Sequence, residues 1–273
     1  MRLITIILKF LKENIVNIVS IFVAIGIIFA DDRSSTIAFL DVGQGDSILI
    51  QKNNFQILID GGPDNTVLFE ISKYMNPLDR RIEIVVLTHP HADHIKGLLY
   101  VIENYEIGEV WINRIDYDLQ DYKYLLESDV VIKDVKLGDG LRYEDLLLEV
   151  IYPFDSDEQE QDPNINNESI VLKVEIGDTS LLLMGDAEHE VENKLLDKDL
   201  IAKTDILKAG HHCSRTATSK SFIESSSPGF AICSLGENNK FGHPHDETLV
   251  NLQTYSVQHL TTSEQGNIVF RFK

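Results

Sequence analysis

Short runs of hydrophobic residues along this chain predict a globular domain in which strands alternate with helices. Residues 82–87, Ile-Glu-Ile-Val-Val-Leu, are mostly apolar and β-branched, as is typical of a buried strand. Apolar residues at helical spacing follow at once: Ile95, Leu98, Leu99 and Ile102. Similar alternation fills residues 36 to about 150 and returns over 168–273, which predicts an α/β fold built in two halves.

A polar segment joins the two halves. Residues 153–163 are acidic, bounded by prolines and almost without apolar side chains. This composition predicts a solvated loop, with a metal-attracting or regulatory loop as the alternative. Residues 36–273 are numerous enough, in a chain that is 43% hydrophobic, to form the core of one domain.

The amino-terminal residues have a different pattern. Residues 15–30 form an apolar run broken only at positions 17, 20 and 26, and residues 4–10 are also largely apolar. A helix that crosses a bilayer needs about 20 such residues, so the two runs together are long enough for one helix or a bent pair. This pattern predicts a segment that is directed to a membrane.

Basic residues precede this apolar run at Arg2, Lys9 and Lys12, and such a flank stays in the cytoplasm. The sequence therefore predicts a signal anchor or transmembrane segment over 1–31, with the domain that follows on the outer face of the membrane. One alternative is a protein that is secreted after cleavage, which Ile28 disfavours because a small residue is preferred there. Another is an amphipathic helix packed on a soluble domain.

The net charge of the chain bears on its substrates. The chain carries −20, and residues 1–30 contribute +2, so the remaining 243 residues carry −22. A domain this acidic repels polyanions, and the sequence has no cluster of basic residues of the kind that binds nucleic-acid phosphates. The composition thus disfavours a nuclease without excluding one, and it favours a smaller substrate.

Candidate metal ligands are concentrated in one short segment. Residues 88–94 read Thr-His-Pro-His-Ala-Asp-His, directly after the predicted strand over 82–87 and before the predicted helix. Imidazole and carboxylate groups suit zinc, manganese or iron, whereas calcium prefers more oxygens and structural zinc prefers thiolates. Four donors in one loop indicate a metal site: His89, His91, Asp93 and His94.

Further donors follow two other apolar runs. Asp186 comes after the predicted strand over 179–184, and His211 and His212 come after the run over 205–210. Ligands of α/β sheets collect at the carboxyl ends of the strands, so these distant segments can converge on one site. His189 and His259 have no such context and are expected to be surface or packing residues.

Taken together, these motifs resemble the metallo-β-lactamase superfamily, and within it the ComEC-type branch found in bacterial competence proteins. The resemblance extends over about 36–273 and implies a four-layer αββα sandwich. Its motifs occur in the family's order at residues 39–47, 57–62, 88–94, 167–173, 185–186, 208–214 and 242–245.

The resemblance also implies a site for two divalent metal ions, with zinc expected and manganese or iron as alternatives. His89 and His91 would bind one ion, Asp93 and His94 the other, and Asp186 would bridge both. Either His211 or His212 would complete the cluster.

The resemblance further implies residues around the metal ligands. Asp60 would orient a ligand histidine, with the opening of the Gly61-Gly62 turn as the alternative role. Asp46 could approach the metals or cap a turn. Asn166 and Ser169 could face the site or form the turn that leads into a strand.

Two features depart from the family's pattern. Cys213 stands where the family usually has glycine, and it would be a small buried side chain, crowd the substrate or offer a thiolate to the metal. With Cys233 it forms no evident disulfide framework. No histidine lies between His94 and His189, so a ligand of the lactamases is missing. The ComEC-type branch shares this absence, which weakens an antibiotic-degrading function.

The expected chemistry is hydrolysis at two metals, which would bind a bridging water, lower its pKa and clamp the attacking and leaving oxygens of an ester. A phosphodiester is the expected substrate, with a carboxylic ester or lactone as an alternative. Asp93 and His243 are the candidate catalytic residues. His243 and His245 could bind a phosphate or protonate the leaving group, or be idle surface residues.

Two other functions remain open from the sequence. One is a nuclease that works beside a DNA-uptake channel formed by another chain. The other is a metal-binding scaffold without catalysis, in which the metals serve folding alone.

Overall fold

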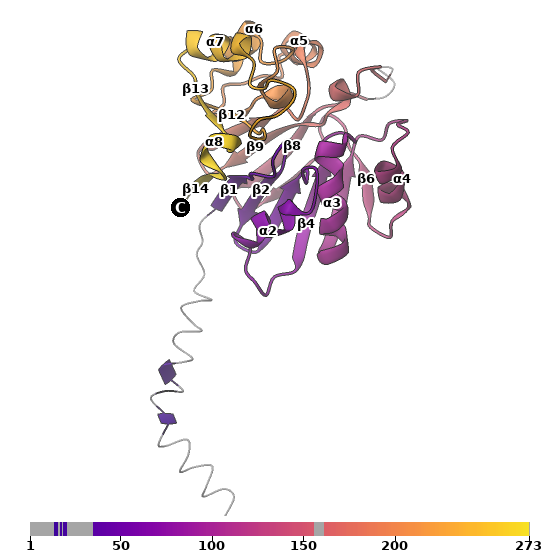
Figure 1. Ribbon diagram of the computed structural model, residues 1–273, viewed down its shortest axis with the longest axis vertical. Helices are drawn as coiled ribbons and strands as arrows, with labels where there is room; N and C mark the ends of the chain where they lie inside the picture. The colour runs from indigo at the N-terminus through magenta and orange to yellow at the C-terminus, as the bar shows by residue number, and fades with distance from the viewer. Residues whose placement is uncertain (1–13, 16, 18, 21–34, 156–160, 273) are drawn as a thin grey trace, which may run out of the picture. The chain divides into compact units, whose positions relative to one another are not determined.

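The computed structural model describes residues 14, 15, 17, 19, 20, 35–155 and 161–272 (Figure 1). The chain divides into two units, residues 1–33 and residues 34–273. The predicted membrane segment over 1–31 lies almost wholly outside the described residues, and the few described there are helical. Within the described part of the chain, no helix has both the length and the apolar character needed to cross a bilayer.

The larger unit contains two seven-stranded sheets. The first has the strand order β14-β1-β2-β3-β4-β5-β6, with β3 to β6 parallel and the remaining pairs antiparallel. Its strands are β1 Ser35–Phe39, β2 Ile48–Lys52, β3 Phe55–Ile59, β4 Arg81–Leu87, β5 Glu106–Ile112, β6 Ile132–Asp134 and β14 Ile268–Phe272.

The second sheet has the strand order β13-β12-β11-β10-β9-β8-β7. Its strands β10 to β13 are parallel, whereas β7 to β10 form an antiparallel meander. The bounds are β7 Gly140–Tyr143, β8 Leu146–Tyr152, β9 Val171–Ile176, β10 Thr179–Leu183, β11 Ile206–Lys208, β12 Phe230–Cys233 and β13 Gln258–Thr261.

Helices cover the outer face of each sheet (Figure 1). Those of the first half are α2 Thr66–Ser72, α3 Ala92–Asn104 and α4 Gln120–Glu127. Those of the second half are α5 His189–Asp197, α6 Lys220–Ser226, α7 Asp246–Thr254 and α8 Thr262–Gln265, with two short 3-10 turns, η1 Ile165–Glu168 and η2 Gly210–Cys213.

Three apolar layers hold this arrangement together. One contains side chains of both sheets, such as Ile59 and Val86 from the first and Leu172 and Leu181 from the second, so the sheets pack face to face. A second lies between the first sheet and α2 to α4, and a third lies between the second sheet and α5 and α6. Burial of these faces is the main stabilising contribution, and it produces the predicted order helix, sheet, sheet, helix.

One local prediction was wrong at the start of its segment. We expected residues 153–163 to form a solvated loop, and Gln161 and Pro163 are exposed, but Phe154 is only 6% exposed and packs in the layer between the second sheet and its helices. Burial of this ring and a 2.7 Å hydrogen bond from the N–H of Leu137 to the carbonyl of Pro153 hold the start of the segment on the fold.

Candidate metal centre

The candidate ligands come from loops at the carboxyl ends of parallel strands. His89 and His94 follow β4, Asp186 follows β10, and His212 lies in η2 directly after β11. The first two belong to the first sheet and the others to the second, so the site lies where the two sheets meet. This is the convergence that the strand-then-donor pattern predicts.

Asp186 lies at the centre of the cluster. Its Oδ2 atom is 3.4 Å from Nε2 of His94 and 3.4 Å from Nε2 of His212. Nε2 of His89 is 3.8 Å from the same oxygen. All four side chains are at most 2% exposed, so one buried carboxylate is surrounded by three imidazoles.

The described residues contain four overlapping groups of three donors whose ligand atoms lie within 4.8 Å of one another. Every group contains His94, His212 or both, and Asp186 occurs in two of them. The groups are His89, His94 and Asp186; Asp93, His94 and His212; Asp46, Asp60 and His94; and Asp46, Asp186 and His212.

Asp60 orients His94, as the resemblance implies. Its Oδ2 lies 2.8 Å from Nδ1 of His94, and its two oxygens accept hydrogen bonds from the backbone N–H and the hydroxyl of Thr88 at 2.8 and 2.7 Å. A carboxylate on Nδ1 leaves Nε2 free to face a metal. Burial raises the pKa of Asp60, although His94 opposes that shift.

His212 is held from behind by the second sheet. Its Nδ1 atom lies 2.8 Å from the carbonyl oxygen of Ser234 and 3.4 Å from Oδ1 of Asp46. The other oxygen of Asp46 forms a 2.6 Å ion pair with Lys208, which is 0% exposed and also donates to the carbonyls of Gly185 and Ala209 at 3.1 and 3.0 Å. Asp46 thus lies beside the cluster, paired with a lysine that the sequence analysis did not single out.

His211 and His212 have different surroundings, which favour His212 as the candidate ligand. His211 is partly exposed, and its Nδ1 atom lies 2.9 Å from Glu188, whereas His212 is buried among the donors. No donor group of the described residues includes His211 or His91. The amide of Asn166 donates a hydrogen bond to the carboxylate of Glu188 at 3.0 Å. Asn166 therefore supports the pair of His211 and Glu188.

These different surroundings predict different effects of two alanine variants. H212A is expected to lower the affinity for a divalent cation by at least about 100-fold, more than the loss of an outer partner of a ligand. H211A, its neighbour and matched control, should bind the cation as the unchanged protein does. Isothermal titration of each metal-free variant measures both affinities, and equal losses in the two would refute the distinction.

The start of α3 places the remaining predicted ligands, with His91 at the N-cap and Asp93 in the first turn. Nδ1 of His91 lies 3.0 Å from Nε2 of His89, and Oδ2 of Asp93 lies 3.6 Å from Nε2 of His212. Ser169 lies 3.3 Å from Nδ1 of His89 and accepts a hydrogen bond from the backbone N–H of Asp186 at 3.1 Å. Ser169 therefore links the donors of the two sheets.

The two histidines after β12 differ in their distance from the cluster. The ring of His243 lies 6.1 Å from that of His212, and His243 is 9% exposed. The ring centroid of His245 lies 4.8 Å from that of His243, and Nδ1 of His245 accepts a hydrogen bond from the backbone N–H of Arg215 at 3.0 Å. Burial, followed by repulsion from His212 and His211, lowers the pKa of His243 to about 4.

The electrostatics of the cluster fit a bound cation. Burial disfavours protonation of His94 and His212, but nearby carboxylates outweigh it and raise the pKa of both well above the usual value. Burial would raise the pKa of Asp186, but His212 and His94 hold it well below the usual range. A cation that displaces these protons would satisfy the same carboxylates.

Buried polar atoms without hydrogen-bond partners also indicate that this cluster suits a bound cation. Among the described residues, four donor atoms at this site are buried and lack a hydrogen-bond partner: His94 Nε2, His212 Nε2, Asp186 Oδ1 and Asp46 Oδ1. An unpaired buried polar atom costs about 1–3 kcal/mol, so four in one place are unusual unless another group binds there. Imidazole nitrogens and carboxylate oxygens are the donors that zinc, manganese and iron accept.

Glycine allows two close approaches of the backbone at this site. A side chain at Gly45 would place its Cβ 2.1 Å from the carbonyl oxygen of Asp93, and one at Gly210 would place it 2.3 Å from that of Ala187. Gly45 thus brings the loop that carries Asp46 against the start of α3. Gly210 does the same for η2 and the segment after Asp186.

A disulfide joins Cys213 to Cys233, with their Cα atoms 5.5 Å apart. This corrects the expectation that the two cysteines form no framework. It also corrects the suggestion that Cys213 supplies a thiolate to the metal, because its sulfur is bonded to another sulfur. The separation of 20 residues in the sequence gave no sign of this pairing.

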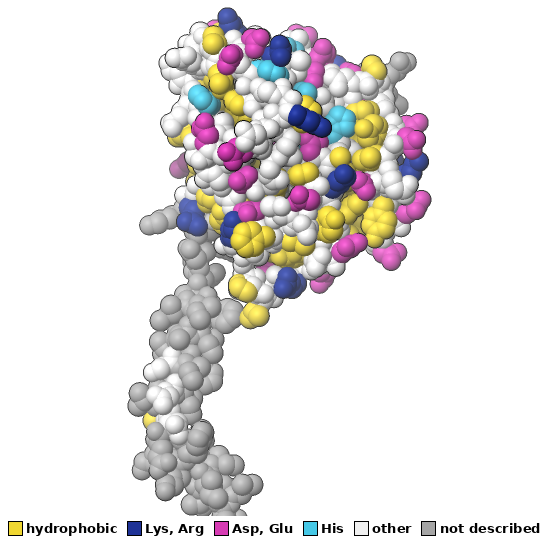
Figure 2. All heavy atoms as spheres, viewed as in Figure 1, with side chains coloured by type: hydrophobic (Ala, Val, Ile, Leu, Met, Phe, Trp, Pro, Cys, Tyr) yellow, Lys and Arg dark blue, Asp and Glu magenta, His cyan; other side chains and the backbone are white. Residues whose placement is uncertain are grey.

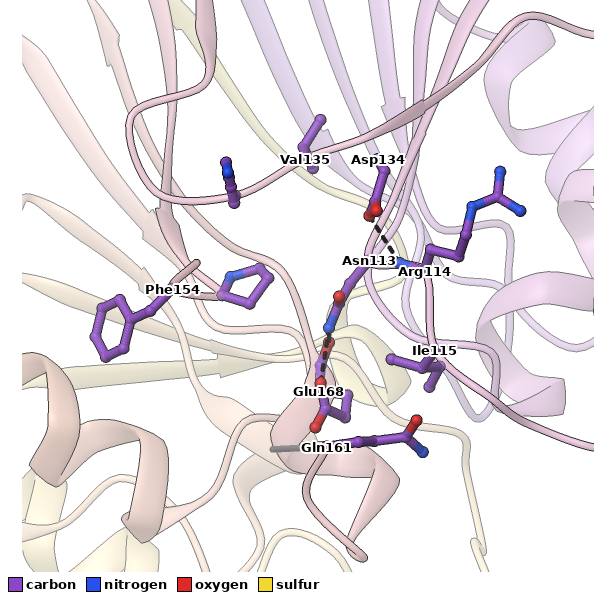
Figure 3. Close-up of a pocket in the computed structure, with 10 residues that line it drawn as sticks. Asn113, Arg114, Ile115, Asp134, Val135, Phe154, Gln161 and Glu168 are labelled. Carbon is purple, nitrogen blue, oxygen red and sulfur yellow. Dashed lines mark hydrogen bonds between the residues drawn. The ribbon is translucent and has the colours of Figure 1, made fainter. Parts of the chain in front are cut away.

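A polar cavity of about 290 Å³ lies at the ends of β5 and β6 (Figure 3). In Figure 3, Asn113 points towards Glu168, and its amide donates to the carboxylate of Glu168 at 2.8 Å. Glu168 directly precedes Ser169, so this bond anchors the segment that brings Ser169 to His89. The cavity itself contains none of the donors described above.

Comparison with known proteins supports the resemblance that the sequence motifs indicate. A family profile described as the metallo-beta-lactamase superfamily matches residues 40–236. The chain is 31% identical to ComE operon protein 3 of Bacillus subtilis, over 86% of this chain and 32% of that protein. It is 26% identical to competence protein ComA of Neisseria gonorrhoeae, over 88% of this chain and 32% of that protein. The chain therefore spans about a third of the length of these relatives.

A solved structure also shares the fold. The metallo-beta-lactamase fold protein YhfI from Bacillus subtilis has a TM-score of 0.59 at 11% sequence identity, covering 88% of this chain and 100% of that one. At this identity the likeness concerns the arrangement of sheets and helices, not the substrate.

Proposed function

Since this chain belongs to the metallo-beta-lactamase superfamily and is a metal-dependent hydrolase of that fold, we propose that it is a phosphodiesterase with two metal ions. The observation that carries the proposal is the buried carboxylate of Asp186, which faces imidazoles from both sheets. A group in this position can contact two cations at once, as two-metal hydrolysis requires.

The family resemblance suggests how two cations would be shared, with His91 added to the donor groups described above. His89, His91 and Asp186 would hold one, while Asp93, His94 and His212 would hold the other together with Asp186. Bound divalent cations supply Lewis acidity and lower the pKa of a water molecule.

Residues around the donors have supporting roles in this proposal. Asp60 and the carbonyl of Ser234 each occupy Nδ1 of a histidine, which fixes the tautomer that presents Nε2 to the cation. His243 is mostly neutral at neutral pH because its pKa is about 4, so it suits a hydrogen bond to a substrate oxygen better than protonation of a leaving group.

The substrate class follows from charge. A cluster of cations binds an anionic phosphodiester oxygen more strongly than the neutral carbonyl of a carboxylic ester or lactone. The chain as a whole carries −20, and on the face visible in Figure 2 acidic and basic side chains are intermixed, without a broad basic patch. Both features favour a small diester, such as a lipid headgroup or a wall-polymer substituent, over a long polyanion.

A nuclease is the second candidate, because one of the relatives is named a competence protein. In that case the chain would work beside a DNA-uptake channel on another chain. Cleavage of single strands that requires metal and weakens with salt would support it.

The proposed location is the outer face of the membrane, with the amino-terminal segment as anchor. The disulfide between Cys213 and Cys233 supports this location, because disulfides persist in oxidising compartments and are rare in the cytosol.

The proposal predicts that the full chain, purified in mild detergent, contains about two metals and hydrolyses bis-p-nitrophenyl phosphate, with activity lost on chelation and restored by added metal. Elemental analysis and absorbance of released nitrophenolate measure the two properties. Bound metal without turnover of any ester would instead support a scaffold, and absence of metal would contradict the whole proposal.

A further inference from the structure

The disulfide joins the two residues that are adjacent in sequence to a hydrogen-bonded pair of the metal centre. Cys213 directly follows His212, and Cys233 directly precedes Ser234. The imidazole of His212 and the carbonyl of Ser234 share the 2.8 Å hydrogen bond that orients this histidine. The covalent bridge and the hydrogen bond therefore join the same two backbone segments, η2 and the end of β12.

The backbone of η2 needs such a restraint. His211, His212 and Cys213 have φ angles of 46°, 54° and 61°, so three successive residues with side chains adopt the left-handed conformation. Residues other than glycine rarely adopt this conformation, and they persist in it only where the surrounding structure enforces it. A loop with three of them would relax to other conformations if nothing held its end.

The loop is buried and is also held by backbone hydrogen bonds, from the N–H of His211 to the carbonyl of Gly185 at 3.2 Å and from the N–H of His245 to the carbonyl of Cys213 at 3.0 Å, but its apolar contacts with β12 are few. Cys213 lies in a small apolar cluster with Ala209, Cys233 and Leu235, all of them at most 2% exposed. Two of these four residues are the bridged cysteines themselves. The disulfide is thus the strongest link between the end of η2 and β12 in the described part of the chain.

We infer that the Cys213–Cys233 disulfide is a positioning device that holds the imidazole of His212 at the cation site, so that metal affinity depends on the oxidation state of the cysteines. This inference rests on the metal centre proposed above. The two thiols would lose two protons and two electrons by exchange with a disulfide oxidant of the outer compartment, which would be reduced to two thiols.

Three forms of the full chain test this inference: the bridged protein, the same protein unfolded and refolded with a phosphine reductant, and C213S/C233S. Refolding is needed because both cysteines are fully buried. Chelator competition with Zn²⁺ and with Mn²⁺ measures metal affinity, thermal unfolding of the metal-free protein measures stability, and thiol counting after denaturation verifies the bridge.

Loss of the bridge is expected to lower the affinity of the weaker-bound cation by about 10-fold, the lower end of the range for losing an outer partner of a ligand. The melting temperature should fall by about 6–12 °C, as for a loop of this length in a protein of this size. The reductant should leave C213S/C233S unchanged, which controls for effects of the phosphine on the metal.

The experiment distinguishes failure of the disulfide inference from failure of the proposed metal centre. Equal metal affinity in the bridged and unbridged forms, even with a lower melting temperature, would overturn the inference and leave the disulfide a purely structural link. Two free thiols in the denatured protein that was never treated with the reductant would overturn it as well. Failure of every form to bind metal would instead refute the proposed metal centre.

Discussion

Replacing Asp186 with asparagine is expected to lower turnover of bis-p-nitrophenyl phosphate by two to three orders of magnitude, about the effect of removing one electrostatic group from a transition-state site. The amide keeps the shape of the carboxylate but carries no charge, so it cannot neutralise two cations. Bound metal should fall from about two ions to one or fewer, because Asp186 would contact both.

The matched control for this variant is D178N, which makes the same change at an exposed position in the turn between β9 and β10. It should retain full activity and metal content. Circular dichroism of D186N should match that of the unchanged protein, since the side chain has almost the same volume. An active D186N protein would show that Asp186 does not bridge the metals and would remove the main support for the proposed chemistry.

Replacing Lys208 with methionine should lower the free energy of unfolding more than the other substitutions proposed for this protein. Methionine fills a similar volume but leaves Asp46 as a buried carboxylate without its 2.6 Å partner. Breaking a buried ion pair from one side costs about 3–5 kcal/mol, so the free energy of unfolding should fall by that amount. Urea denaturation of the metal-free protein, followed by far-UV circular dichroism, measures it.

The double variant D46N/K208M separates the ion pair from packing. Because it removes both charges together, it should recover most of the stability that K208M loses. K203M changes an exposed lysine a few residues earlier and should be neutral. If K208M were as stable as K203M, the buried pair would contribute little, and the position of Asp46 would have to depend on the Gly45 turn.

The segment with the most candidate donors could be predicted from sequence because four of them fall within six residues directly after a recognisable strand. The apolar runs likewise indicated β4 and β10. The packing of the two sheets against each other followed from the resemblance, since periodicity gives the faces of a strand but not the sheet that it packs on.

Other features depend on contacts between distant segments, which no local pattern encodes. His211 and His212 are adjacent and chemically identical, and only the left-handed backbone of η2 decides which of them faces Asp186. The sequence left open whether Asn166 faces the site or forms the turn before a strand, and in the structure its amide donates to the carboxylate of Glu188. Lys208 offered one signal that was overlooked, because a charged residue within an apolar run must find a buried partner.

The location of the centre between the two sheets has a consequence for the synthesis of this protein. A nascent chain that ends before β10 would carry His89, His91, Asp93 and His94 but neither Asp186 nor His212. Even the first sheet is incomplete until β14 emerges and pairs with β1. A ribosome-bound fragment that ends before His212 therefore lacks a complete donor set, and we expect the cation site to form only once the second sheet has folded against the first.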